Sequence, residues 1–468
     1  MKRYLEITFV ACQRGLVTVV LCMFVLFVSM SFAQADTQQG TNTQPETSNN
    51  AITLSWVLEK TLLSNIRLQT FPYELRVNEA LTIQAGITPN PEFSVEVENV
   101  LGTGDKQGVD NAEISLGLSQ LVELGDKRQR RIDFAQAGER QKLAEYELIR
   151  LDILSQATQA YYQVLRLQAL QAWNLKRIEV EDKALKTIES RAKAGAVAQA
   201  DVTKMALRLM RARAVQQALE GDTQIAKHRL AAMWSSEAHF DRVVGELDMI
   251  TVIPTAASVL NAIETAPQYL QLLSVERLMY AKRRMEESKA QYDITLGVGV
   301  RSYDGFDDGA LMFNLSMPIL LSNPNQGNIL AAKANEDMAM EQQKLARGQL
   351  KLTLLEIHQI MINNARQASQ LKEELLPLAQ RLLKETQSAY QTGQANVLQL
   401  VDAQTELFNV ERELIEAKVA VYQQRLELER ITGQSMTTAL SNVYTSPISN
   451  NPLNVGLHTE PKLAQENK

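Results

Sequence analysis

An unbroken heptad pattern in the second half of the chain restricts its fold more than any other feature. Between residues 350 and 382, ten positions follow one another at alternating spacings of four and three, and nine of them are apolar. Residues at this spacing line one face of an α-helix and form the seam of a coiled coil. The positions are Leu350, Leu354, Ile357, Met361, Asn364, Ala368, Leu371, Leu375, Leu378 and Leu382. The pattern predicts a long helix that packs against another helix along its length.

A second helix with the same spacing follows the break at Gly393 and extends from Leu400 to Val421. We expect these two helices to pair as an antiparallel hairpin. The first half of the chain has a similar seam between Ile153 and Leu167. There, residues 127–190 predict one continuous helix, which at about 1.5 Å per residue would be on the order of 95 Å long.

Four short segments alternate apolar and polar residues, which is typical of β-strands. They lie near residues 92–100, 111–121, 291–303 and 309–320. Strands of about ten residues with one apolar face suit a transmembrane sheet with lipid on one side and water on the other. The alternative is a small soluble sheet packed on helices. In a membrane, four strands are too few to form a closed cylinder, so that interpretation requires several copies of the chain.

Helices and strands follow in the same order in both halves, which predicts an internally duplicated, mainly α-helical fold with a small β part. We expect the first repeat at residues 51–250 and the second at 251–436. Residues 36–50 and 437–468 are polar and rich in turn-forming residues, so they are predicted to be disordered tails.

The N-terminus predicts export. Three cationic residues, Lys2, Arg3 and Arg14, precede an apolar run from Leu16 to Phe32. The small-x-small sequence Ala33-Gln34-Ala35 follows the run, as in a cleaved signal peptide ending at residue 35. A membrane anchor is the alternative. Cleavage would remove both cysteines, Cys12 and Cys22. It would also remove three cations and one anion, which changes the formal charge from −6 to −8 and argues against nucleic acid as a partner.

Enzyme motifs are missing from the sequence. The four histidines, His228, His239, His358 and His458, have no close metal-ligand spacing, and there is no nucleophile elbow, phosphate-binding loop or dinucleotide-binding glycine motif. We therefore expect no catalytic residue, no metal site and no cofactor, and energy for any transport would come from a partner.

Several motifs carry a family resemblance. Ala85-Gly86 and Pro89-Asn90-Pro91 precede the first strand, Glu96-Val97-Glu98-Asn99 continues it, and Glu123-Leu124-Gly125-Asp126-Lys127-Arg128 follows the second strand. Together with the duplicated order of helices and strands, these motifs resemble those of the TolC-like outer-membrane efflux channels, and the resemblance extends over residues 51–436. The last two motifs are similar to the cobalt-zinc-cadmium branch, from which Asp126 departs where a glycine is typical.

Gly195 and Gly393 each end a long helix, and Asp201 and Gln399 both follow six residues later. Reversal of a long helix in a tight turn favours glycine, because the turn uses a left-handed backbone. The resemblance implies that these turns are the tips to which a periplasmic adaptor protein docks.

The resemblance also implies a homotrimer, in which each chain gives four strands to a twelve-stranded outer-membrane β-barrel and its helices to a periplasmic tunnel with a closable gate. The matching gate positions are Asp402, Gln399, Tyr390 and Asp201. Three copies of Asp402 would form a cation-attracting ring, and Tyr390 with Asp201 would form a latch. The arginine of the usual latch falls on Ala395. The alternatives are that Asp402 is an ordinary solvated carboxylate and Tyr390 a packing residue.

Polar strand residues would line the lumen, where charge can bias which ions pass, or they serve only solubility. They are Ser94, Glu96, Glu98, Asp293 and Arg301. The implied partners are outer-membrane lipid, the adaptor and an inner-membrane RND-type pump, and the implied cargo is divalent heavy-metal cations. Drugs or secreted polypeptides are alternative cargoes, and an exported structural coiled-coil rod is an alternative of another class.

Overall fold

A computed structural model describes residues 51–104, 107–109, 111–248, 252–303, 308–319 and 321–434. The predicted signal peptide at residues 1–35, the polar segment 36–50 and the C-terminal tail 437–468 lie outside the described residues.

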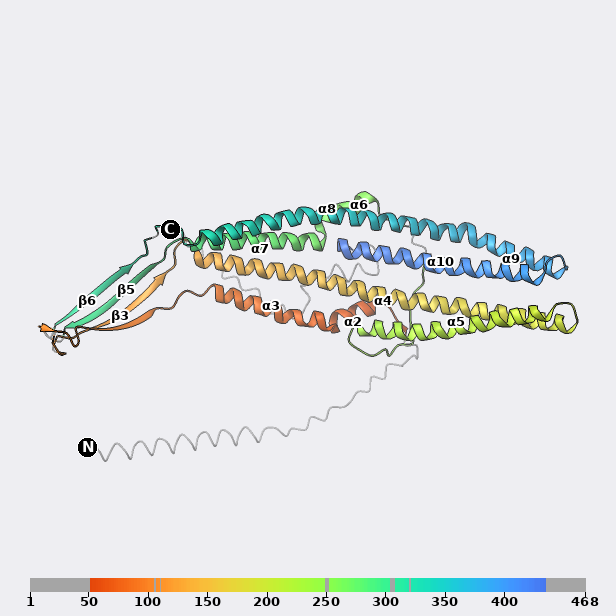
Figure 1. The fold of residues 1–468 in the computed structure, drawn as a ribbon, viewed down its shortest axis with the longest axis horizontal. Coiled ribbons are helices and arrows are strands. Elements are labelled where there is room, and N and C mark those ends of the chain that lie inside the picture. The colour runs from red at the N-terminus through yellow and green to blue at the C-terminus, as the bar shows by residue number, and fades with distance from the viewer. Residues whose placement is uncertain are drawn as a thin grey trace, which may run out of the picture. The chain divides into compact units, whose positions relative to one another are not determined.

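The two halves of the chain repeat one order of elements (Figure 1). The first half contains β1 (Ala51–Ile52), α2 (Leu54–Ser64), α3 (Ile66–Ala85), β2 (Glu92–Glu98), β3 (Glu113–Val122), α4 (Lys127–Lys193) and α5 (Gln199–Ala232). A two-residue strand, β4 (Arg242–Val243), precedes the second half. The second half contains α6 (Ala256–Asn261), η2 (Ala262–Thr265), α7 (Pro267–Lys289), β5 (Ile294–Tyr303), β6 (Asp308–Ser316), α8 (Gln326–Gln370), η3 (Leu371–Leu375), α9 (Leu376–Gln391) and α10 (Val397–Thr432). The duplicated, mainly helical fold is confirmed.

Four strands form one antiparallel sheet in the order β2-β3-β5-β6. The register aligns apolar residues across the sheet on one face, such as Val95, Leu116, Val300 and Leu311 in one row. All four side chains are exposed in the single chain. The apolar face therefore does not pack on the chain's own helices, which contradicts the soluble-sheet alternative.

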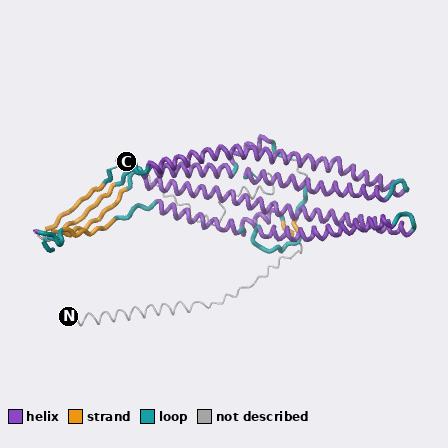
Figure 2. The backbone as a smooth tube through the Cα atoms, in the orientation of Figure 1, coloured by secondary structure: helices purple, strands orange, loops and turns teal. Residues whose placement is uncertain are grey.

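The long helices pack side by side and extend away from one end of the sheet (Figures 1 and 2). Near the sheet, α3 packs on α4, α4 on α7, and α7 on α8. Farther along, α5 pairs with α4, and α10 pairs with α8 and α9 and also packs on α4. Among the described residues, no helix combines the length and apolar character needed to cross a membrane.

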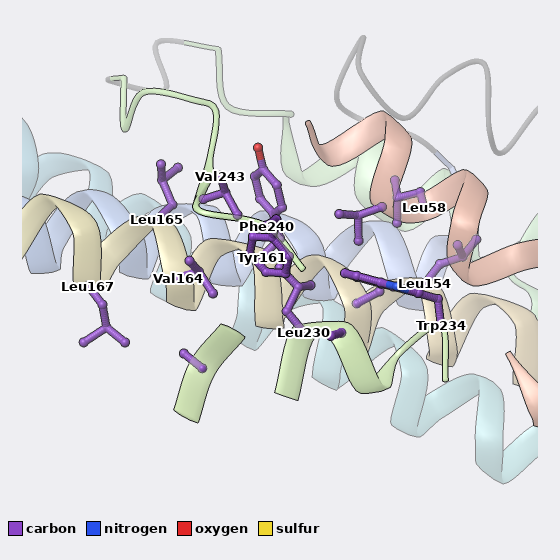
Figure 3. Packing of buried hydrophobic residues seen from close by; sticks show 14 residues of the cluster. Leu58, Leu154, Tyr161, Val164, Leu165, Leu167, Leu230, Trp234, Phe240 and Val243 are labelled. Atoms are coloured by element: carbon purple, nitrogen blue, oxygen red, sulfur yellow. The ribbon is translucent and has the colours of Figure 1, made fainter. Parts of the chain in front are cut away.

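The largest apolar core cluster joins α2, α4, α5 and the segment that follows α5 (Figure 3). Leu58, Leu154 and Leu230 are fully buried in it, and Trp234 packs beside them. The Tyr161 hydroxyl donates to the Val244 carbonyl oxygen and so ties this segment to α4. The cluster holds the end of α5 in place, far from the turn at Gly195.

The predicted heptad seam is confirmed as far as Leu371 and is wrong beyond it. Leu375, Leu378 and Leu382 are 40%, 56% and 45% exposed. The cause is η3, a π-helical turn in which the Leu376 N–H donates to the Leu371 carbonyl oxygen five residues earlier. A π-turn inserts one extra residue into the helix. Past this turn the buried or partly buried positions are instead Leu376, Ala379, Leu383, Thr386, Ala389 and Tyr390.

The first long helix is uninterrupted. The structure extends the predicted 127–190 to a helix of 67 residues, Lys127–Lys193, which at about 1.5 Å per residue is on the order of 100 Å long.

Candidate functional site at the two hairpin tips

The two tips end their helices in the same way. Gly195 and Gly393 have φ values of +73° and +78°. In each turn an N–H donates to a carbonyl oxygen five residues back, from Ala196 to Arg191 at 2.9 Å and from Gln394 to Ala389 at 2.8 Å. A Cβ added at either glycine would have no atom within 4 Å. Glycine is therefore favoured by the left-handed backbone and not by lack of space.

The helices that leave the tips begin differently. At the start of α10, the Asn396 side chain accepts from the Gln399 N–H and the Gln399 side chain accepts from the Asn396 N–H, both at 2.9 Å. This is a capping box. At the start of α5, Ala198 gives no side-chain cap. The predicted gate residue Gln399 thus uses its amide oxygen in the cap, and its NH2 group remains on an exposed side chain.

An apolar cluster, here called the tip cluster, joins the two hairpins. Its buried members come from all four helices that meet there: Ile188 of α4, Met205 of α5, Tyr390 of α9, and Val397 and Val401 of α10. Ala395, where the resemblance places an arginine, packs against the cluster. Apolar contact therefore occupies the position of a charged latch.

Tyr390 lies in the tip cluster with only 8% of its surface exposed. The Arg191 guanidinium lies 4.3 Å from the centre of its ring, a cation–π contact between the hairpins. The Tyr390 hydroxyl is buried and has no hydrogen-bond partner in the described part of the chain. Asp201, in the first turn of α5, therefore does not bond to it within one chain.

Sequence reasoning missed a buried ionic network behind the tip cluster. Glu181 of α4 is 0% exposed, and its Oε1 accepts from Arg177 Nε at 2.9 Å and from Arg208 Nη2 at 3.3 Å. Arg208 also donates to Thr405 Oγ1 of α10 at 2.8 Å, which links the hairpins. Glu181 Oε2 and Arg208 Nε are buried without a hydrogen-bond partner among the described residues. Continued in heptads, the seam from Ile153 reaches Glu181, and a charge at a seam position could have indicated this network.

Asp402 lies on an exposed face of α10. Glu406, Asn409 and Glu413 follow it at helical spacing and are exposed too. Asp402 forms no ion pair with another described residue in the single chain. The face is thus acidic and unneutralised at its tip end, which suits attraction of cations.

On the polar face of the sheet, Arg301 forms the centre of a charge network. Its guanidinium contacts Glu98 at 3.0 Å, Glu113 at 3.1 Å and Ser115 Oγ at 2.9 Å. Glu96 lies in the same cross-strand row as Ser115 and Arg301. The structure thus brings together three of the five predicted lumen residues.

Ser94 lies two residues farther along β2, opposite Gly117 of β3. A Cβ on Gly117 would approach Ser94 Oγ to 2.6 Å.

Asp293, the fifth predicted lumen residue, lies elsewhere. Strand β5 begins at Ile294, so Asp293 is outside the strand. Its carboxylate pairs with Lys127 at 2.7 Å and accepts from the Leu124 N–H at 3.1 Å. Asp293 fixes the junction between the sheet and the first turn of α4, because it satisfies a loop N–H and a cation there.

Burial shifts the pKa values of a glutamate and a lysine on α10. Burial raises the pKa of Glu411, although Lys176 opposes the shift. Burial, together with the like charge of Lys372, lowers the pKa of Lys418. No group of three or more histidine, cysteine, aspartate or glutamate side chains within the described ranges could hold a metal ion.

Comparison with known proteins matches this chain to one protein family. The model described as "Outer membrane efflux protein" matches residues 57–236 and 284–434, more than half of the chain. The cobalt-zinc-cadmium resistance protein CzcC of Cupriavidus metallidurans is 25% identical over 419 residues, which cover 88% of this chain and 97% of the relative.

Solved structures share the fold. The outer membrane protein VceC of Vibrio cholerae is 18% identical with a TM-score of 0.64, over 82% of this chain and 97% of VceC. CusC, described in the context of transmembrane channel formation, is 14% identical with a TM-score of 0.63, over 83% of this chain and 93% of CusC.

Proposed function

This chain belongs to the outer membrane efflux protein family, and from that membership we propose that three copies form the outer-membrane channel of a tripartite efflux pump. Residues 1–35 direct export as a signal peptide and are then cleaved off. The channel lets substrate leave the cell without catalysis or cofactor. An inner-membrane RND-type pump supplies the energy, and a periplasmic adaptor protein docks at the tips around Gly195 and Gly393.

The observation that carries the proposal is that the sheet is incomplete in one chain. Strands β2 and β6 are its two edges, and unpaired edges invite pairing with another copy. Three four-stranded sheets would close into a cylinder of twelve strands. The exposed apolar face would then contact lipid, and the network around Arg301, with Glu96 and Glu98, would face the water inside.

The helical layer supports the same arrangement. Helices α3 and α8 lie at its two ends, and each has exposed apolar side chains on one face. These are Ile66, Tyr73, Val77 and Leu81 on α3, and Met338, Leu345 and Leu352 on α8. Burial of such stripes between α8 of one copy and α3 of the next would contribute about 25 cal/mol per Å² of apolar surface.

The proposed gate is at the tip end. Three copies of Asp402 would converge on the pore axis, with Gln399 beside them and Tyr390 and Asp201 at the contact between hairpins. Because the Tyr390 hydroxyl has no partner among the described residues of one chain, Asp201 included, a latch to Asp201 would have to join neighbouring copies.

We propose divalent heavy-metal cations such as cobalt, zinc and cadmium as the cargo. The support is the similarity to CzcC over most of both chains. The acidic face at Asp402 suits cations, although the channel would conduct a cargo chosen by the pump.

Replacement of Asp402 by Asn tests the gate in purified channels in planar bilayers. We expect the cation-over-anion permeability ratio to fall at least about twofold, because the focused negative potential is lost. Glu189→Gln is the control, since Glu189 is an exposed acid near the other tip. An unchanged ratio in Asp402→Asn would remove Asp402 from the pore.

The cargo is tested in cells. Zinc, cobalt, cadmium and copper contents after metal challenge would be measured in a deletion strain with and without the restored gene, together with survival on a drug panel. Metal accumulation that the gene reverses is expected. Normal metal contents with new drug sensitivity would keep the channel but refute the metal cargo. A heat-modifiable trimer that requires detergent separates the channel from an exported rod.

A further inference from the structure

The π-helical turn η3 separates two apolar sets on α9. Leu376, Ala379, Leu383 and Tyr390 form the set that faces α10 and the tip cluster. The other set, Leu375, Leu378 and Leu382, continues the heptads of α8 and is exposed. Matching members of the two sets are neighbours in the sequence, such as Leu378 and Ala379. One residue along an α-helix is a rotation of about 100° around the helix axis, so the two sets lie on different faces. Both sets could serve as a coiled-coil seam, and η3 decides which of them does.

Pro377 explains why the π-turn forms at this place. It is the second residue of α9, so it lies inside what would otherwise be a continuous helix. Proline has no N–H for the carbonyl four residues back, here that of Glu373, and its ring collides with that carbonyl in a regular α-helix. The wider π-turn relieves this conflict. In the first half, α4 runs without a break and contains no proline.

The described register has unfavourable features near both ends of α9. At the tip it buries the Tyr390 hydroxyl without a partner, which costs free energy. Beside η3, burial and then the like charge of Lys372 lower the pKa of the half-buried Lys418, although the carboxylates of Asp248 and Glu246 oppose the shift. These features bring the two registers closer in free energy.

We propose that η3 is a register switch that inserts Tyr390 into the tip cluster or withdraws it. When η3 converts to α-helix, α9 turns by about 100°, the exposed leucines enter the seam with α10, and Ala389 takes the place of Tyr390. The aromatic contact with Arg191 is lost, and the second tip separates from the first. The switch is a property of a single chain, whereas its role in opening a gate rests on the proposed function.

Cysteine reporters at adjacent positions read the register directly. Leu378→Cys and Ala379→Cys would be made separately in the full-length gene; the natural Cys12 and Cys22 lie in the predicted signal peptide. In purified protein we expect maleimide to label position 378 on the order of tenfold faster than position 379, because Leu378 is exposed and Ala379 buried. Adding Pro377→Ala should bring the ratio close to one or invert it. An unchanged ratio would overturn the switch.

A one-residue deletion gives the opposite variant. When the deletion of Glu373 is combined with Pro377→Ala, Leu371 and Leu376 are four residues apart and no proline ring collides with the preceding turn, so α-helix can continue while Leu376, Ala379 and Tyr390 still face inward. We expect the maleimide labelling rate at position 378 to stay on the order of tenfold higher than at position 379. We also expect channel opening to be lost. Normal opening of this variant, with circular dichroism showing intact helix, would overturn the switch.

A third variant distinguishes a change of register from a general loosening of the helix. Leu382→Gln, combined with Pro377→Ala, disfavours burial of the second set and should restore the original labelling ratio. Failure to restore it would mean that Pro377→Ala merely loosens the helix, which would contradict the switch. If no form conducts ions, the channel proposal fails, but the labelling ratios still decide whether the register changes.

Discussion

In the first hairpin, α4 is a single helix of 67 residues, whereas its counterpart in the second hairpin is divided into α8, η3 and α9. The first hairpin has charged groups buried between its helices, with Glu181 held by Arg177 and Arg208. Within the described residues of the second hairpin, the corresponding length holds leucines and alanines together with the π-turn.

The difference shows how two copies of one helical hairpin can have different mechanical roles. A buried ion pair requires one geometry, because its partners are costly to separate in a medium of low dielectric constant. Apolar seams of leucine and alanine tolerate a change of register at lower cost. We infer that the first hairpin is the fixed part and the second the adjustable part of the tip.

The largest expected effect is in the first hairpin. Glu181→Ala would leave Arg177 and Arg208, which are both partly buried, without their carboxylate, and loss of one partner of a buried pair costs up to about 3–5 kcal/mol. The free energy of unfolding from chemical denaturation measures this cost. Glu179→Ala is the matched control, because Glu179 forms an exposed pair with Lys183 and should leave stability nearly unchanged. Equal effects of the two substitutions would show that the buried network does not fix the first hairpin.

The tips themselves should respond equally. Gly195→Ala and Gly393→Ala each place a side chain on a left-handed backbone, at a cost of about 1–2 kcal/mol. Neither added methyl meets a neighbour within 4 Å, so backbone strain alone sets the cost. Gly348→Ala, in the interior of α8 with open space around it, should instead stabilise by about 0.5–1 kcal/mol. A clearly larger loss at Gly393, seen in the same unfolding assay, would mean that the second tip has contacts beyond one chain.

The smallest effect concerns the buried hydroxyl of Tyr390. Tyr390→Phe removes an unpaired polar group and should leave stability unchanged or raise it by up to about 1 kcal/mol. Tyr161→Phe is the comparison, because the Tyr161 hydroxyl donates to Val244 O and its loss should cost about 1 kcal/mol. If Tyr390→Phe destabilises the assembled protein as much, its hydroxyl has a partner in a neighbouring copy.

The sequence predicted the periodic parts of the fold well, because helices and strands bury residues at fixed spacing. It predicted the seam to Leu371 but not its change of register, since counting heptads assumes a regular helix; Pro377 was the available indication. The Asn396 and Gln399 cap also follows a readable pattern of a short polar residue and a glutamine three positions later. The cross-helix contacts of Arg208 and the position of Asp293 outside β5 depend on packing between distant segments, which spacing along the chain does not encode.

The order of strands in the sheet has a consequence for biosynthesis. The central pair joins β3 to β5, so that Leu116 lies opposite Val300, and the two halves of the sheet come from distant parts of the chain. On the proposed export route, the β2–β3 ribbon would emerge first and would wait, with an apolar face and unpaired backbone groups, until all of α4 and α5 had followed. Strand pairing over such a separation is slow, because the chain loses the entropy of loop closure before any hydrogen bond between the strands stabilises it. An open strand edge in this interval is a site for aggregation. On that route, chaperones that bind extended apolar segments would be needed most while only the first half of the chain has emerged.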